Sequence, residues 1–66
     1  MKLTVNGDSR SATTSQSVRE LIVEMGLANA VVAVELNKQI VPRKAHESTE
    51  LTDGDTLEIV TLVGGG

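Results

Sequence analysis

One stretch of the chain has the periodicity of an α-helix, and its short length limits what the rest can form. Apolar residues recur there at positions i, i+3, i+4 and i+7: Val18, Leu21, Ile22 and Met25. Ser17 and Glu20 match a capping box, in which Ser17 accepts from the backbone N–H of Glu20 and Glu20 reaches back, and Gly26 predicts the C-terminal stop. A helix of about nine residues is marginal in isolation, so it must lie on a sheet.

Stretches with strand character lie on both sides of this helix. They span residues 2–6, 9–14, 31–36, 39–41 and 56–60. Alternation places Leu3 and Val5 on the inner face of the first, and Leu57 and Ile59 on the inner face of the last. The second is polar and is expected at a sheet edge. Segment 31–36 is predicted to be a central strand, but its pattern leaves open which face is inward.

Turn residues separate these strands. Asn6-Gly7 is a strong hairpin signal, and Asn37-Lys38 predicts a second tight turn. Asp53-Gly54-Asp55 predicts a turn before the last strand. Residues 43–52 form a polar connection in which Leu51 is the apolar anchor.

The resulting order is ββαβ(β)β, which indicates an α+β fold. The compact arrangement is a β-grasp: a mixed sheet of four to five strands with one main helix packed across one face. The first and last strands are then expected side by side in its centre. We expect residues 1–63 to form this domain and residues 64–66 to form a flexible glycine tail.

Composition excludes several classes of function. The 66 residues contain no cysteine and no aromatic residue, which excludes disulfides, thiolate metal sites and a cysteine nucleophile, and requires an aliphatic core. The net charge is −3, and the acidic excess lies in residues 34–66. This argues against nucleic acid or an anionic membrane, and it leaves two alternatives: a partner with a basic face, or an acidic surface that is simply solvated. With no signal or membrane-spanning pattern, we expect a cytoplasmic protein.

The segment after the last strand ends in Gly64, Gly65 and Gly66. Without side chains these residues can thread a slot too narrow for others, and three extended residues reach about 10 Å. We interpret the Gly66 carboxylate as the reactive group. Because a carboxylate is a poor electrophile, a partner must activate it, most simply by adenylation with ATP. The alternative is a frayed end or an added glycine segment.

Apolar residues beside this tail are candidates for partner binding. If Leu57 and Ile59 point inward, Val60 and Leu62 point outward, where a partner would have to cover them. With Val63 they are predicted to be docking residues. The alternative is that they only extend the strand and pack locally.

The remaining polar residues give weaker signals. His46 lacks a second histidine at a metal-binding spacing, so we expect it in a solvent-exposed loop. A helix cap accounts for Ser17, and a turn accounts for Asp53 and Asp55. Arg43 either meets an acidic group of a partner or stays solvated. We therefore expect neither a metal site nor an intrinsic catalytic site.

Four segments together resemble the ThiS family, the sulfur carriers of thiamin biosynthesis. They are residues 17–21, 36–43, 53–55 and the Gly65-Gly66 end, and the likeness covers essentially the whole chain. The resemblance implies a ubiquitin-like β-grasp. The family pattern needs two terminal glycines where this sequence has three, which leaves the role of Gly64 open.

The resemblance also implies partners and a cycle. An adenylyltransferase related to ubiquitin-activating enzymes would use ATP and magnesium to adenylate Gly66, and a sulfur-donating enzyme would convert it to a thiocarboxylate. Thiazole synthase would take that sulfur. The chain itself would be a monomeric co-substrate without a bound cofactor, rather than an enzyme. Alternatives are a carrier for molybdopterin synthesis or protein conjugation, or a β-grasp interaction module without acyl chemistry.

Overall fold

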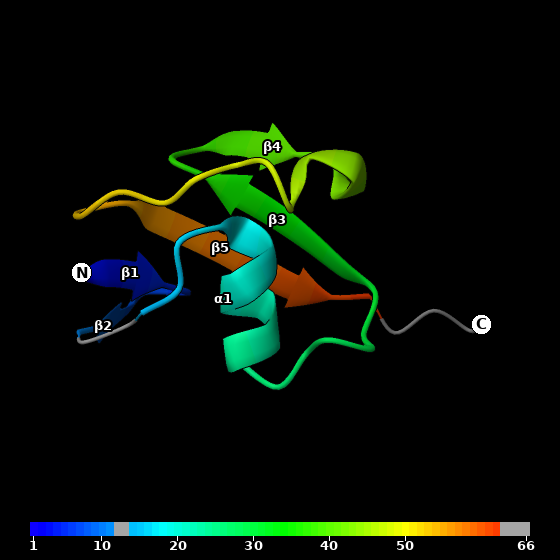
Figure 1. Cartoon of the computed structure of the whole chain (residues 1–66), viewed down its shortest axis with the longest axis horizontal. Helices are drawn as coiled ribbons and strands as arrows, with labels where there is room; N and C mark the ends of the chain where they lie inside the picture. Colours follow the sequence, from blue (N-terminus) through cyan, green and yellow to red (C-terminus); the bar gives the residue numbers. More distant parts are fainter. Residues whose placement is uncertain (12–13, 63–66) are drawn as a thin grey trace.

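The computed structural model describes residues 1–11 and 14–62, which form a five-stranded sheet crossed by one α-helix (Figure 1). The elements are β1 (Leu3–Val5), β2 (Asp8–Arg10), α1 (Val18–Glu24), β3 (Val32–Leu36), β4 (Gln39–Val41), the 3-10 helix η1 (Arg43–Ala45) and β5 (Thr56–Thr61). No helix among these residues is long and apolar enough to cross a membrane.

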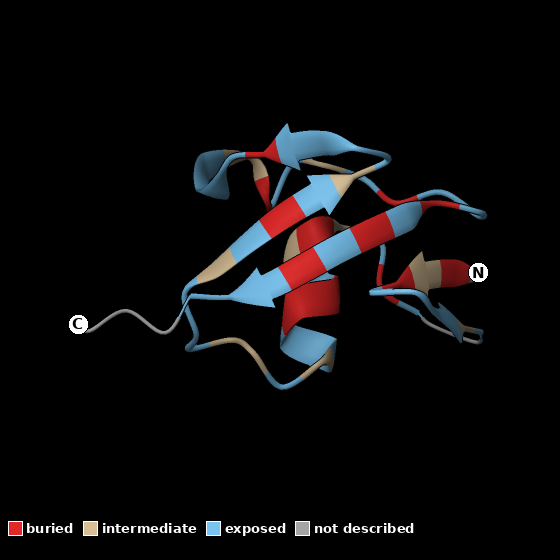
Figure 2. Cartoon of the chain, turned by 180° about the vertical axis from the view of Figure 1, so that it is seen from behind, coloured by how far each residue is buried: buried red, intermediate tan, exposed pale blue. Residues whose placement is uncertain are grey.

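The strand order is β2-β1-β5-β3-β4, so β5 occupies the centre. β1 runs parallel to β5, and the other neighbouring strands are antiparallel. Helix α1 lies across one face and leaves the other face open (Figures 1 and 2). This confirms the predicted β-grasp, with its mixed sheet and with the first and last strands side by side.

Both predicted hairpin turns are present. Asn6 and Gly7 have φ values of 53° and 84°, and Asn37 and Lys38 have 50° and 71°, the left-handed pair that a two-residue hairpin needs. The Asn6 side chain also bonds β5: it donates to the Ile59 carbonyl (3.0 Å) and accepts from the Ile59 N–H (2.8 Å). Asn6 thus forms the turn and extends the contact between the first and last strands.

The edge strand β2 differs from its predicted bounds of 9–14. It begins at Asp8, because a two-residue turn pairs Asp8 directly with Val5. It ends at Arg10, which pairs with the first residue of the three-residue strand β1. Residues 12–13 of the predicted strand lie outside the described part of the chain.

Helix α1 begins as predicted and ends slightly earlier. The Ser17 hydroxyl accepts from the Glu20 N–H (3.1 Å), but the Glu20 carboxylate accepts from the Gln16 N–H (2.7 Å) instead of reaching Ser17. The helix has seven residues rather than about nine. Gly26, at φ 79°, turns the chain so that the Leu27 N–H bonds the Ile22 carbonyl, which closes a Schellman cap.

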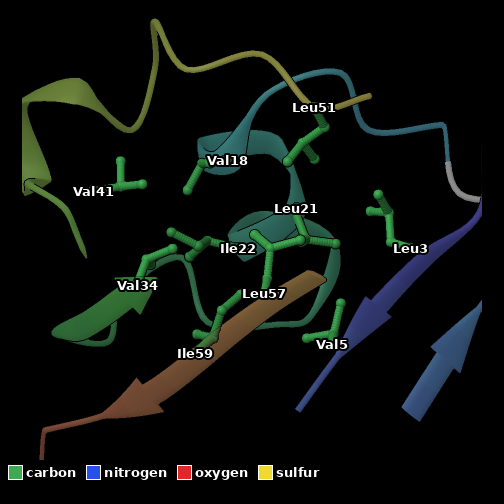
Figure 3. Packing of buried hydrophobic residues seen from close by; sticks show 10 residues of the cluster. All are labelled: Leu3, Val5, Val18, Leu21, Ile22, Val34, Val41, Leu51, Leu57 and Ile59. Atoms are coloured by element: carbon green, nitrogen blue, oxygen red, sulfur yellow. The ribbon is translucent and has the colours of Figure 1, made fainter. Parts of the chain in front are cut away.

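The core lies between α1 and the inner face of the sheet (Figure 3). It consists of ten aliphatic residues: Leu3, Val5, Val18, Leu21, Ile22, Val34, Val41, Leu51, Leu57 and Ile59. Every inward residue predicted for the first and last strands is among them. The face of β3 is now determined, because Val34 is buried while Ala33 and Glu35 are exposed (Figure 2).

His46 contradicts its prediction as a solvent-exposed loop residue, because only 5% of it is exposed. Its Nε2 atom lies 3.2 Å from the Val41 carbonyl oxygen, and its own carbonyl accepts from the Arg19 N–H at 2.9 Å. The 3-10 helix after Pro42 folds the polar connection back against the start of α1. His46 is therefore a structural residue that joins η1 to α1.

Asp55 joins the predicted 53–55 turn to the second hairpin. Its carboxylate accepts from the Thr52 N–H (2.8 Å), the Thr52 hydroxyl (3.1 Å) and the Asn37 side-chain amide (2.9 Å). Burial by itself raises the pKa of Asp55, but the hydrogen bonds from Thr52 and Asn37 outweigh it, so the pKa lies below its ordinary value of 3.8.

We expect acid to destabilise the protein partly through Asp55. The pKa of Asp55 is lower in the folded state than in the unfolded state, so its ionised carboxylate stabilises the fold. This stabilisation is complete above the unfolded-state pKa and is lost as the pH falls through the folded-state pKa. The Asp55→Asn substitution is expected to cost about 1 to 3 kcal/mol at pH 7 and to flatten the loss of stability below about pH 4. Urea unfolding followed by far-ultraviolet circular dichroism measures both effects. Asp8→Asn is the exposed control, and equal acid sensitivity of Asp55→Asn and the unmodified protein would contradict this role.

Candidate functional site at the end of the central strand

The predicted site begins where β5 ends. The Leu62 N–H donates to the Val31 carbonyl (2.8 Å), so pairing with the β3 side of the sheet continues one residue beyond the strand. The sheet thus holds the chain as far as Leu62. The predicted site residues Val63, Gly64, Gly65 and Gly66 lie outside the described residues.

Val60 and Leu62 point away from the core, as predicted. They are 55% and 51% exposed, so local packing does not bury them. Ala33 lies directly opposite Val60, and Val31, which is 56% exposed, bonds Leu62 through its carbonyl. We call Val31, Ala33, Val60 and Leu62 the apolar strip. Alternation with the buried Val34 and Ile59 places this strip on the sheet side away from α1, at the end where β5 finishes.

The same open face carries negative charge in the middle of the sheet. Glu35 and Glu58 lie directly opposite each other on β3 and β5, and both are exposed. Like charges in this arrangement reduce the stability of a sheet. Ile40, which is 78% exposed, lies opposite Glu35 on β4. The open face therefore changes from acidic at its centre to apolar at the end of β5.

Sequence reasoning missed Val31 and Ala33 because it left the inward face of segment 31–36 open. The sequence did indicate the outward face. Glu35 is expected in solvent, and Val31 and Ala33 lie four and two residues before it, so alternation places them on the same face. The pairing of Glu35 with Glu58 had no such signal, since it depends on the register between strands far apart in sequence.

The titratable side chains of the described residues do not gather into a metal site. Within 1–11 and 14–62, no three His, Cys, Asp or Glu side chains are grouped so that they could hold a metal ion. Asp53 accepts from the Lys2 N–H (2.6 Å), and Asp55 has the structural partners given above. Arg43 is exposed on η1. These residues hold the fold together or face solvent, and they do not converge on one point.

Comparison with known proteins gives a consistent match. The model of the ThiS family matches residues 3–66. The chain is 37% identical to the sulfur carrier protein ThiS of Bacillus subtilis, covering 97% of this chain and 98% of that one. A crystal structure of a thiamine biosynthesis protein (ThiS) from Geobacter metallireducens superimposes with a TM-score of 0.81, at 38% identity and with both chains fully covered.

A second kind of relative is much longer. The chain is 44% identical over its whole length to part of a thiazole synthase from Paramagnetospirillum magneticum, of which it spans only 20%. Both kinds of relative align with the whole domain, including the strip-bearing strands β3 and β5. The family model matches through the terminal glycines, and the solved ThiS structure superimposes on this ubiquitin-like β-grasp. The chain therefore belongs to the ThiS family.

Proposed function

We propose that this protein is the sulfur carrier for thiazole formation in thiamin biosynthesis, acting as a co-substrate of partner enzymes. The observation that carries the proposal is the family match, which extends through Gly65 and Gly66. It is supported by the relative named a sulfur carrier, which this chain covers almost completely.

In the proposed cycle, the chemistry takes place on Gly66. An oxygen of its carboxylate attacks the α-phosphorus of ATP on an adenylyltransferase related to ubiquitin-activating enzymes, and pyrophosphate leaves. A sulfur-donating enzyme then supplies sulfur at the oxidation level of sulfide, which attacks the acyl carbon, displaces AMP and leaves a thiocarboxylate. Gly64 and Gly65 let the tail enter the active site, since they lack side chains. ATP and magnesium belong to the partner, so the carrier needs no cofactor and we expect it to act as a monomer in the cytoplasm.

Thiazole synthase is the proposed acceptor of the sulfur. This step is supported by the thiazole synthase of which a part is 44% identical to this chain. A carrier and a synthase that must meet in every cycle could be joined in one polypeptide without changing the chemistry. A thiocarboxylate is a suitable donor because it is a soft nucleophile and is ionised at neutral pH.

The apolar strip is proposed to contribute the binding energy that the tail lacks. Ordering three residues costs about 3 to 6 kcal/mol in backbone entropy, and glycine lies at the upper end. Glycines bury almost no apolar surface in return. Leu62 is the last described residue before the tail, and both it and Val60 are about half exposed, so a partner holding the tail would cover them. Val63 is proposed to join them.

We expect the double substitution Val60→Ser/Leu62→Ser to raise the KM for the adenylyltransferase about 10- to 100-fold. Each half-exposed side chain contributes on the order of 1 kcal/mol when a partner covers it, and 1.4 kcal/mol corresponds to tenfold. Steady-state adenylation kinetics measure the effect. Val23→Ser is the matched control, because Val23 is 49% exposed but lies on α1. An unchanged KM for the double variant would contradict docking through the strip.

The pathway is tested by exchange of labelled pyrophosphate into ATP. We expect exchange to depend on this chain with the adenylyltransferase of thiamin biosynthesis and to be far slower with that of molybdopterin synthesis. Exchange with the molybdopterin enzyme alone would assign the carrier to that pathway. Absence of exchange with either enzyme would contradict the proposed acyl chemistry.

A further inference from the structure

A basic groove near the end of β5 has no role in the sulfur-transfer cycle described above. It is a hollow of about 790 Å³ between α1, the segment that enters β3, and η1. Arg19 lines it from α1, and Arg43 and Lys44 line it from η1. In Figure 1, η1 and the segment that enters β3 lie toward the end of the molecule where β5 finishes, whereas α1 crosses the middle of the sheet.

The charge of the groove is opposite to that of the chain. Three of the six basic residues line it, with only one of the nine acidic residues, Glu47. The ion pair within residues 1–11 and 14–62 joins Arg10 to Glu24, and it involves none of the three basic residues of the groove. A protein with a net charge of −3 therefore presents a local positive surface, and such a surface attracts carboxylates.

The fold positions the backbone segments that carry the three cations of the groove. The Arg19 N–H donates to the His46 carbonyl at 2.9 Å, which fixes α1 against η1, and His46 itself is buried. The Arg19 guanidinium lies 3.4 Å from the Ala28 carbonyl, a long contact that leaves most of its donors available. The backbones that carry Arg19, Arg43 and Lys44 are thus positioned before any ligand binds, which lowers the entropy cost of binding.

The groove adjoins the last described residues before the tail. Val31 and Val32 line it, and the Val31 carbonyl accepts from the Leu62 N–H. A partner that takes up the residues after Leu62 therefore comes against the rim of the groove. Val31 also belongs to the apolar strip, so this residue links the groove, which α1 borders, to the open face of the sheet.

We propose that this groove binds an acidic segment of the partner protein that receives the glycine tail. The inference rests on the proposed function, which requires such a partner. A peptide segment fits better than a small anion for two reasons. Val31 and Val32 give the groove apolar surface, and Glu47 would repel a concentrated negative charge such as phosphate. Alternating acidic and apolar side chains match this lining.

Binding by the groove is tested by nuclear magnetic resonance with the ¹⁵N-labelled full chain. The probes are a peptide of alternating Glu and Leu, the same peptide with Lys in place of Glu, and inorganic phosphate. We expect the Glu-Leu peptide to shift the amides of Arg19, residues 28–32 and residues 43–47. The Arg43→Glu/Lys44→Glu variant should bind at least tenfold more weakly.

Lys2→Glu/Lys38→Glu is the matched control, since it changes the net charge equally and neither residue lines the groove. Its affinity should stay within twofold of the unmodified chain. Absence of shifts with the Glu-Leu peptide, equal binding of the Lys-Leu peptide, or the same shifts with phosphate alone at the same concentration would each overturn the proposal.

The role in sulfur transfer is tested with the adenylyltransferase and with thiazole synthase. The groove variant should raise the Kd for at least one of them about tenfold at roughly 0.05 M salt, and the difference should shrink at roughly 0.5 M salt as screening increases. Suppose that the unmodified chain is converted to the thiocarboxylate and that the groove variant binds both partners as tightly as the unmodified chain does. The groove inference is then wrong and the carrier function stands. If the unmodified chain is not converted, the carrier function fails, and the peptide titration still decides the groove.

Discussion

A chain with one alanine added after Gly66 is expected to lose adenylation by at least 100-fold. The addition moves the terminal carboxylate about 3.5 Å from its place and adds a Cβ to a tail that is proposed to enter a slot too narrow for side chains. A misplacement of 1 Å in a reacting atom can already cost about 100-fold. The measurement is the rate of pyrophosphate exchange into ATP with the thiamin adenylyltransferase.

One alanine added before Met1 is the matched control. Met1 is 39% exposed and far along the sequence from Gly66, so this addition should leave the exchange rate unchanged. A C-terminally extended chain that exchanges at the unmodified rate would show that the Gly66 carboxylate is not the activated group.

Leu57→Ala is expected to leave the protein largely unfolded at 25 °C. Leu57 is fully buried near the start of the central strand β5, and its side chain points toward Leu21 and Ile22 of α1 (Figure 3). A buried Leu→Ala change costs about 2 to 5 kcal/mol, while a domain of this size has only about 3 to 5 kcal/mol of stability. With no aromatic residue to report on unfolding, far-ultraviolet circular dichroism during urea titration is the measurement.

Two further variants show whether the loss of stability comes from the cavity that Leu57→Ala leaves in the core or from substitution in general. Leu57→Met conserves most of the volume and should cost less than about 1.5 kcal/mol. Ile40→Ala removes a side chain that is 78% exposed and should leave the urea midpoint nearly unchanged. A Leu57→Ala midpoint equal to that of Ile40→Ala would contradict the packing described here.

The elements that the sequence predicted well are those specified by neighbouring residues. Ser17 and Gly26 mark the ends of α1 through contacts within the helix, and Asn6-Gly7 forms its turn through its own backbone conformation. Alternation correctly gave the inner residues of β1 and β5, since a strand with one buried face has a period of two. These features need no knowledge of distant contacts.

The features that the sequence did not predict depend on segments far apart. His46 is buried because η1 folds onto the start of α1, a contact to Arg19 that no local pattern shows. The opposition of Glu35 and Glu58 follows from the register of β3 and β5. The basic groove likewise combines α1, the start of β3 and η1.

The candidate site was predictable in part. Its outward residues Val60 and Leu62 follow from alternation, and the structure confirms their exposure. Their docking role, the role of Val63 and the boundary between domain and tail at residues 63–64 stay predictions, because residues 63–66 lie outside the described part of the chain.

An intact mass tests most directly whether Gly66 carries sulfur. The protein is incubated with ATP, magnesium, the thiamin adenylyltransferase and a sulfur donor, and the C-terminal peptide is then sequenced by fragmentation. We expect a mass increase equal to the exchange of one oxygen for one sulfur, localised to the terminal glycine. An unchanged mass, under conditions that convert the Bacillus subtilis sulfur carrier, would contradict the carrier function.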